Sequence, residues 1–300
     1  MKKSIFLGLL ALTVSTMAKG GPFSGDADVA VGYGYDSNVS IDEVDLNTNI
    51  GDQFSDVRLS GGLDYQSDDE LKLSARMTLS NKYYNTFDQF DNALILSSVA
   101  AKKKWGKWEL GFTARYIDFK LDGDGFQELT QLSPTLSWFI NKKSYLRIAL
   151  ETTDESYDDR KTRDNDRDEV SLSYYYFLNG LRHYITLHAE IANEDAKSRV
   201  FSNDAWQVRL VYQKRLNKIL KDSTLKLSYR YQERDYDDQQ NPGIGDFRED
   251  NRHRYEIELE VPVNSHWSIA AELVYSDYRS NLGSADYTQN VAQLTVKYEF

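Results

Sequence analysis

The chain contains no cysteine, only four prolines and only four histidines. Without cysteine it can form no disulfide framework and cannot carry a lipid on an N-terminal cysteine. After residue 18 the sequence has no uninterrupted apolar stretch approaching the roughly 20 residues that a membrane-spanning helix needs. Any passage through a membrane must therefore be made by strands. The net charge of −11 argues against a nucleic-acid partner, because binding phosphates requires a basic surface.

The first residues have the pattern of a secretory signal peptide. Lys2 and Lys3 precede an apolar run over residues 5–14, and small side chains follow over residues 15–18. The run is too short to span a bilayer, and cleavage after Ala18 would place small side chains where the peptidase requires them. We therefore predict a cleaved signal peptide over residues 1–18 and a single domain over residues 19–300.

The predicted mature sequence is dominated by alternation of apolar and polar side chains. In residues 254–261, for example, Tyr255, Ile257 and Leu259 would share one face of an extended chain, and charged side chains the other. A period of two residues is typical of a strand with two unlike faces. Fourteen such segments can be counted. They cover residues 26–38, 53–65, 71–84, 89–103, 108–120, 127–139, 144–156, 167–178, 182–193, 203–214, 223–235, 251–262, 265–278 and 286–300.

Segment length and connection length favour a membrane barrel. The segments are about twice the soluble mode of about 5–6 residues. Short turns alternate with longer polar loops, as in outer-membrane barrels with tight periplasmic turns. We predict an all-β fold: a transmembrane antiparallel up-and-down β-barrel of about 14 strands in the Gram-negative outer membrane, with both termini periplasmic. Twelve strands remain possible, because residues 94–96 break the alternation and Pro134 removes a ladder donor. A soluble periplasmic or secreted β-protein is the alternative fold.

Aromatic residues beside the predicted connections support the barrel, because such barrels carry an aromatic girdle at each membrane interface. The candidates beside short turns are Trp108, Trp138, Tyr145 and Trp267, and those beside long loops are Tyr83, Tyr84, Tyr157, Trp206, Tyr236, Tyr278 and Tyr287. The chain ends with apolar residues at alternate positions and Phe300. This ending resembles the C-terminal signal that outer-membrane barrels present to the barrel assembly machinery, which is therefore an expected partner.

The polar faces of the segments supply candidate pore-lining residues. These are Arg58, Arg76, Arg115, Arg147, Glu151, Arg209, Lys226, Arg230, Arg254, Glu256, Glu258, Glu260 and Glu272. In one interpretation they form opposed charged ladders that set ion selectivity. In the other they pair across neighbouring strands and fill the interior. We expect the first pairing between the glutamate row at 256, 258 and 260 and the basic residues Lys226 and Arg230.

The sequence offers little support for catalysis or metal binding. Long loops that are acidic at 154–169 and 234–250, and polar at 41–52, could hold divalent cations that bridge lipopolysaccharide, but we favour a solvated, mobile surface, because charge runs are commonly solvated. Residues 122–125 match part of a calcium loop and lack its later ligands. No serine lies in a recognisable motif beside His188 or His253, the two histidines placed away from the short turns. We expect no metal, no cofactor and no enzymatic activity.

Two stretches resemble a known family. Residues 32–39, Gly-Tyr-Gly-Tyr-Asp-Ser-Asn-Val, resemble the opening strand of the barrel of surface lipoprotein assembly modifiers. Residues 278–281, followed by Tyr287, Asn290, Leu294 and Phe300, resemble its final hairpin. The resemblance implies a fourteen-stranded barrel, preceded in that family by a periplasmic tetratricopeptide-repeat domain, that delivers lipoproteins to the cell surface. About seven residues separate the predicted cleavage site from the first predicted strand, so we expect the barrel without the repeat domain.

Three functional hypotheses follow. The first is a narrow, porin-like channel with a charged lumen. The second, implied by the resemblance, is an export or surface-assembly factor with lipoprotein cargo. The third is a structural or adhesive barrel that acts through acidic extracellular loops. In each case outer-membrane lipid and lipopolysaccharide are expected to surround the barrel.

Overall fold

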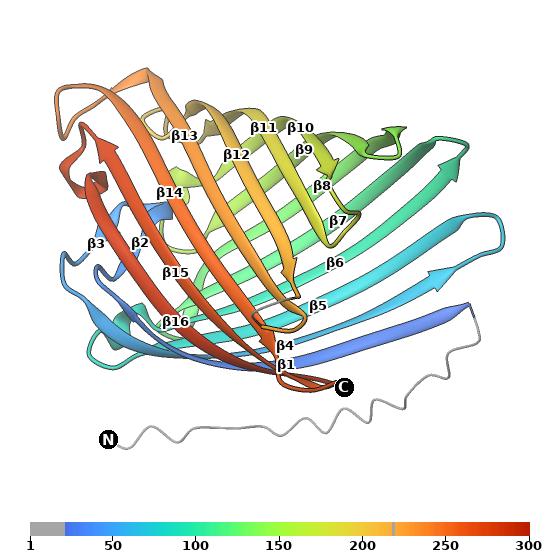
Figure 1. Cartoon of the computed structure of the whole chain (residues 1–300). Coiled ribbons are helices and arrows are strands. Elements are labelled where there is room, and N and C mark those ends of the chain that lie inside the picture. Colours follow the sequence, from blue (N-terminus) through green and yellow to red (C-terminus); the bar gives the residue numbers. More distant parts are fainter. Residues whose placement is uncertain (1–21, 218–219) are drawn as a thin grey trace.

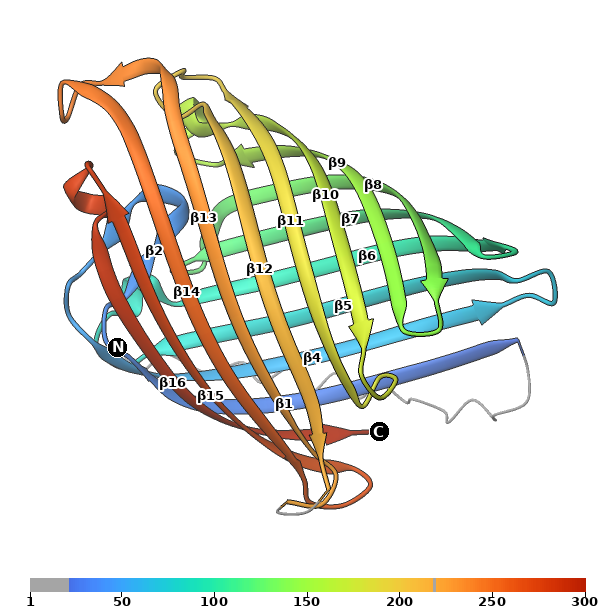
Figure 2. The same ribbon diagram turned by 45° about the horizontal axis from the view of Figure 1, so that its top comes forward.

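The computed structural model describes residues 22–217 and 220–300, so the predicted signal peptide lies outside the described residues. Fourteen antiparallel strands form one closed barrel, in which each strand pairs with its sequence neighbour and β1 pairs with β16 (Figures 1 and 2). Among the described residues, no helix is long and apolar enough to cross a membrane. The barrel strands are β1 (Phe23–Asp36), β4 (Asp52–Gln66), β5 (Leu71–Tyr84), β6 (Asn92–Trp105), β7 (Trp108–Leu121), β8 (Asp124–Asn141), β9 (Ser144–Tyr157), β10 (Asn165–Phe177), β11 (His183–Ala196), β12 (Asn203–Leu216), β13 (Ser223–Asn241), β14 (Asp246–Pro262), β15 (Trp267–Ser280) and β16 (Tyr287–Glu299).

Each predicted segment coincides with a strand, and the count of fourteen is confirmed. Pro134 is accommodated in β8 opposite Phe112 of β7, while the ladder to β9 is interrupted beside it. The broken alternation at 94–96 also has a physical reason. Leu94 and Leu96 face inward beside Phe119 and Ile117 of β7, so this part of the wall is apolar on both faces.

The acidic stretches expected to be long loops are mostly strand. β13 continues to Asn241 and β14 begins at Asp246, so only residues 242–245 connect them. Residues 158–164 likewise are all that separates β9 from β10. Alternation alone predicts ends that are too early for these strands, because the inward side chains near the loops are charged. The cross-strand neighbours Arg234 and Asp250 are an example.

The two faces of the wall differ as predicted. Outward apolar side chains such as Ile191, Leu273 and Leu294 are more than half exposed on the isolated barrel. Polar side chains at alternate positions face inward, where they pair across strands. The apolar outer face suits hydrocarbon, and the closed ladder leaves no strand edge unpaired there.

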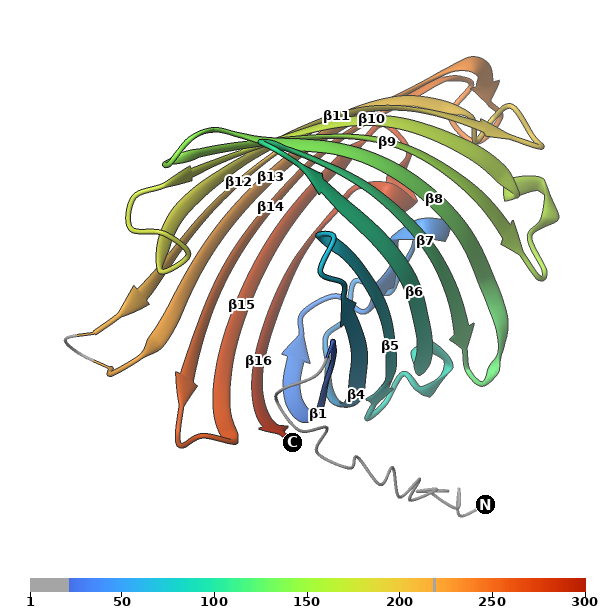
Figure 3. The same ribbon diagram turned by 90° about the vertical axis from the view of Figure 1, so that its right-hand side faces the viewer.

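The connections at the two ends differ in length. Turns such as 106–107 and 142–143 lie at the end where β1 begins and β16 ends. At the other end, residues 37–51 form the longest connection, which contains β2 (Ser40–Ile41), the 3-10 helix η1 (Asp42–Val44) and β3 (Leu46–Asn47). This connection turns into the ring of strands rather than away from it (Figures 1 and 3). We call residues 37–51 the plug, and the end of the barrel that it occupies the mouth.

Part of the predicted girdle is wrong. Trp108, Trp138, Trp267, Tyr83 and Trp206 face outward, as a girdle requires. Tyr145 instead faces the interior, in an aromatic cluster with Phe139, Tyr175, Phe177 and Tyr184. Five tyrosines near the long connections also point inward and are 4–8% exposed: Tyr84, Tyr157, Tyr236, Tyr278 and Tyr287. Position beside a loop does not fix the face of the strand, and here the inward face contacts the plug.

Candidate functional site

The plug is bound to the barrel wall through Asp45. Arg248 of β14 donates from Nη1 and Nη2 to the two carboxylate oxygens of Asp45, at 3.0 and 2.7 Å. The same guanidinium donates from Nε and Nη2 to Asp250, at 2.9 and 2.8 Å. Arg163, in the connection between β9 and β10, donates from Nη2 to Asp45 Oδ2 at 2.7 Å. We call Asp45, Arg248, Asp250 and Arg163 the lock.

The lock is almost dry. Arg248 is 2% exposed and Asp250 is 1% exposed, and the Arg248 guanidinium lies 4.6 Å from the ring centre of Tyr236. Burial alone would raise the pKa of Asp45, but the hydrogen bonds and charge of Arg248 and Arg163 outweigh burial and lower that pKa from its ordinary 3.8. Asp45 is therefore ionised at neutral pH. Such a pair is strongly weakened when one partner is removed, because the other charge then stays buried and uncompensated.

Apolar contacts hold the plug on the side away from Arg248. Ile41 and Val44 pack with Phe126 of β8 and Tyr157 of β9, and partly buried Phe119 lies against this group. This contact explains why the inner face of β7 is apolar at Phe119. The plug therefore combines ionic contacts with Arg248 and Arg163 and an apolar contact with β8 and β9.

The base of the plug is tied to the seam where β1 meets β16. Asn290 N donates to Ser37 Oγ at 2.8 Å, and Ser37 N donates to the Asn290 carbonyl at 2.9 Å. Gln289 Nε2 donates to the Asp36 carboxylate, and Asn38 Nδ2 to the Thr288 carbonyl. The Asp-Ser-Asn string at 36–38 and the final hairpin, the two stretches that carry the family resemblance, are thus in direct contact.

Below the mouth, all the candidate pore-lining residues lie on the inner face of the barrel. Arg76 pairs with Asp64 at 2.7 Å, and Arg115 and Glu151 both contact Gln131.

Lys226 bridges Glu256 and Glu258, at 2.9 and 2.8 Å, as expected for the glutamate row. Glu260 instead accepts from Ser268, and Arg58 and Glu272 lie inward on β4 and β15. Among the described residues, Arg230 pairs with no glutamate of the row, because its register neighbour on β14 is Arg254.

One polar chain in the lumen was predicted only in part, since alternation places His188 and Glu190 on the inner face but does not give their partners. Ser173 Oγ lies 3.0 Å from His188 Nδ1, and His188 Nε2 lies 3.0 Å from Glu190 Oε2. Glu190 also accepts from Gln207 at 3.1 Å and from Arg167 at 3.4 Å. These side chains come from three neighbouring strands, so no local motif could reveal them. The residues of the lock were missed for the same reason.

The described residues contain no group of three or more His, Asp or Glu side chains arranged to hold a metal ion. The partial calcium loop at 122–125 is the tight turn between β7 and β8. Asp122 and Gly123 both have positive φ there, which a two-residue hairpin turn requires.

Comparison with known proteins identifies the family. Residues 92–300 match the family described as the outer membrane protein beta-barrel domain. The chain belongs to this family. The protein is thereby placed in the bacterial outer membrane, and its apolar outer face is the face that meets lipid.

Solved structures with the same fold include two outer-membrane barrels of known source. An anion-selective porin from Comamonas acidovorans is 9% identical, with a TM-score of 0.56 over 93% of this chain and 99% of that chain. OmpT of Vibrio cholerae, in its trimer form, is 11% identical, with a TM-score of 0.55 over 93% of this chain and 100% of that chain. No curated protein sequence matches significantly. At these identities the likeness shows the fold alone.

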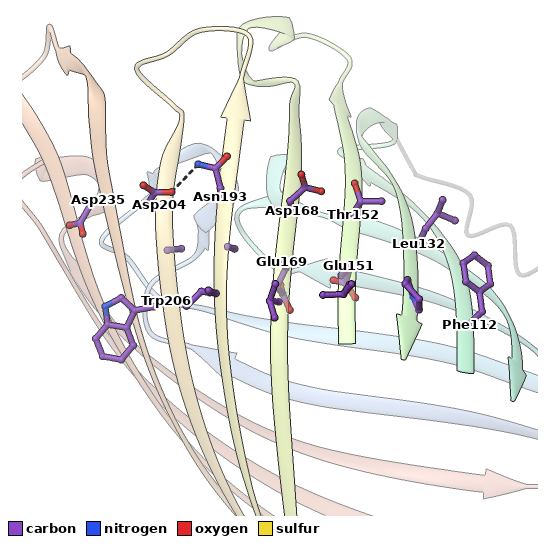
Figure 4. Close-up of a pocket in the computed structure, with 16 residues that line it drawn as sticks. Phe112, Leu132, Glu151, Thr152, Asp168, Glu169, Asn193, Asp204, Trp206 and Asp235 are labelled. Atoms are coloured by element: carbon purple, nitrogen blue, oxygen red, sulfur yellow. Dashed lines mark hydrogen bonds between the residues drawn. The ribbon is translucent and has the colours of Figure 1, made fainter. Parts of the chain in front are cut away.

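The outer face of this outer-membrane barrel carries a shallow concavity of about 860 Å³ over β7–β13 (Figure 4). Exposed Leu150, Val170, Ile191 and Trp206 contribute its apolar part. Toward the loops its lining becomes polar, and Asn193 Nδ2 donates to Asp204 at 2.8 Å there. The change from Trp206 to Asp204 along β12 marks the upper edge of the lipid-facing band, since tryptophan favours the membrane interface.

Proposed function

We propose that the protein is a gated, porin-like channel for small polar solutes, closed at rest by the plug. The observation that carries this proposal is the lock, which binds Asp45 of the plug to Arg248 of β14 and to Arg163 of the connection between β9 and β10. A connection held in this way narrows the entrance to a lumen lined by charged side chains. Loops that only cover a surface do not need a buried arginine and a second, partly buried one to hold one carboxylate.

The charged interior supports a water-filled path rather than a packed core. Arg58, Arg147 and Arg254 face inward and are not fully buried. Rings of fixed charge decide which ions pass through a pore. The fold is also that of a porin described as anion-selective.

The orientation follows from the connections. Outer-membrane barrels have short periplasmic turns and longer extracellular loops. We therefore place the mouth and the plug outside the cell, and the ends of β1 and β16 in the periplasm. Phe300, which is 61% exposed beside Tyr298, is then available to the barrel assembly machinery, and the polar rim above Trp206 meets lipopolysaccharide.

Single-channel conductance tests this function. The refolded mature chain is compared in planar bilayers with a variant in which residues 38–50 are replaced by a short Gly-Ser linker. We expect small or infrequent conductance steps from the wild type and steps at least several-fold larger or more frequent from the variant. Correct folding of both is verified by the strand signal in circular dichroism. If the folded variant stays silent, the lumen is closed by its own wall and the channel function is wrong.

Delivery of lipoproteins to the cell surface is the second candidate. It is favoured by the contact between the two resembling stretches, since Asn290 N donates to Ser37 Oγ and Asn38 Nδ2 donates to the Thr288 carbonyl at the seam. Deleting the gene should then remove a particular lipoprotein from the surface, measured by surface biotinylation and mass spectrometry. An unchanged surface proteome would exclude this role and leave the channel unaffected.

A further inference from the structure

A row of basic side chains crosses the lumen wall at one register level. Arg147 of β9 lies opposite Ser173 of β10, which lies opposite His188 of β11. His188 in turn lies opposite Arg209 of β12. The row continues through Arg230 of β13 to Arg254 of β14. We call Arg209, Arg230 and Arg254 the arginine row.

Three arginines directly side by side repel one another unless nearby negative charge offsets their positive charge. Directly opposed residues on neighbouring strands have Cβ atoms about 4.5–5.5 Å apart, and like charges in such positions repel. Guanidinium groups stay charged at every physiological pH, so the repulsion cannot be relieved by loss of a proton. The barrel therefore holds a concentrated positive charge at this level.

The carboxylates nearest the row make their close contacts with other groups, not with Arg230 or Arg254. Glu256 is held by Lys226 at 2.9 Å and reaches Arg209 only at 3.9 Å. Arg209 Nε donates to the neutral Ser228 hydroxyl at 3.0 Å. In the described part of the chain, Arg230 and Arg254 form no ion pair, and Arg230 Nε is buried without a hydrogen-bond partner.

The other two carboxylates in this part of the lumen also do not pair with the row. Glu190 lies beside His188 and is shared among His188, Arg167 and Gln207. Glu272 lies on the inner face of β15 opposite Glu258, several residues along the strand from Ser276, the register neighbour of Arg254. The side chains of the arginine row are only partly buried, so a solute in the lumen can reach them.

We propose that the arginine row is a binding site for small organic oxyanions, with carboxylate or phosphate as the recognised group. The planar fork of arginine matches both groups in bidentate geometry. Neighbouring guanidinium groups can be bridged by one phosphate or by the two ends of a short dicarboxylate. Use of the site as a step on a transport path rests on the proposed channel, but binding itself does not.

Equilibrium binding tests the site without conduction. The full mature chain, folded in a zwitterionic detergent, is titrated calorimetrically with succinate, with inorganic phosphate and with choline. We expect binding of succinate, phosphate or both, and none of choline. Arg230→Gln should weaken anion binding at least tenfold. Arg279→Gln, which removes the same charge from an exposed position outside the lumen, should leave it unchanged.

The outcomes separate the two proposals. Binding of succinate alone identifies carboxylates as the ligand, and binding of phosphate alone identifies phosphates. Absence of binding by both anions, or equal binding by Arg230→Gln and wild type, overturns the site. If anions bind but no variant conducts, the channel is wrong and the site stands. In conducting variants, the reversal potential in a salt gradient should move toward cation preference when Arg230→Gln is added.

Discussion

At the scale of single residues, the proposed closure depends most on Asp45, which no sequence pattern marks. It is one of 47 acidic residues in the chain, in a stretch that reads as a polar loop. Its importance comes from two arginines more than one hundred residues away, which donate three hydrogen bonds to one carboxylate. Sequence analysis could assign Arg254 or Glu256 to the inner face by alternation, but alternation says nothing about the partners of a loop residue.

Asp45→Asn should release the plug. Removal of one partner of a buried ion pair costs about 3–5 kcal/mol, because the remaining charge stays buried. We expect the open probability in planar bilayers to rise at least tenfold. Glu43→Gln is the control, since only the backbone carbonyl of Glu43 contacts Arg163. Equal gating in the two variants would remove Asp45 from the lock.

Acid should release the plug only below the ordinary range of carboxyl groups. The pKa of Asp45 is lowered from 3.8, so its contribution to closure is present above that pH and is lost as pH falls through the lowered pKa. Because the chain has no cysteine, Val44→Cys reports release through its labelling rate with dithiodipyridine. Val44 is 6% exposed, whereas Leu46 is 40% exposed, so Leu46→Cys provides the reference rate at each pH.

The pH at which labelling accelerates decides whether Asp45 controls release of the plug. We expect the ratio of the Val44→Cys rate to the Leu46→Cys rate to stay low from pH 7 to about pH 4 and to rise below it. A rise that begins near pH 6 would mean that a group other than Asp45 controls closure.

At the scale of elements, the alternation of apolar and polar residues determines the strands, whereas side-chain packing determines how the plug folds. Phe54 of β4 is fully buried against Val39 of the plug and Tyr84 of β5. Gly34 of β1 makes room for it, since a Cβ at Gly34 would lie 2.5 Å from the Phe54 ring. One group of inward apolar residues therefore collects where the plug folds, while the aromatic cluster around Tyr145 lies at the other end of the barrel.

Phe54→Ala should loosen the plug and weaken the barrel near the mouth. Truncation of a buried phenylalanine costs about 3–5 kcal/mol. We expect a lower urea midpoint for the refolded barrel in lipid vesicles and faster proteolysis within residues 37–51. Phe112→Ala, on the lipid-facing surface, should leave proteolysis of the plug at the wild-type rate, and equal proteolysis of both variants would contradict the role of Phe54.

At the scale of the whole molecule, the barrel presents an apolar band to lipid and a charged wall to the lumen. Leu273 and Ala270 lie on the same strand, β15, but on opposite faces, and Ala270 is the register neighbour of Glu260. The two positions therefore test the assignment of faces directly.

Leu273→Arg should destabilise the barrel by about 2–4 kcal/mol, because arginine on the lipid face near the bilayer midplane must be desolvated. Ala270→Arg should be tolerated, because the new side chain enters a water-accessible interior beside Glu260. The measurement is urea unfolding in lipid vesicles. Equal destabilisation by both would mean that the inner face is as dry as the outer one.

The sequence by itself predicted about fourteen strands, the apolar and polar faces of most of them and the inward position of the charged rows. Period-2 alternation is local, and a bilayer imposes it on every strand that crosses. Only the tertiary structure decided the direction in which residues 37–51 fold, the pairing of Asp45 with Arg248 and Arg163, and the alignment of Arg209, Arg230 and Arg254. These contacts depend on the register of neighbouring strands and on closure of the ring, which bring residues far apart in the chain within a few ångströms of one another.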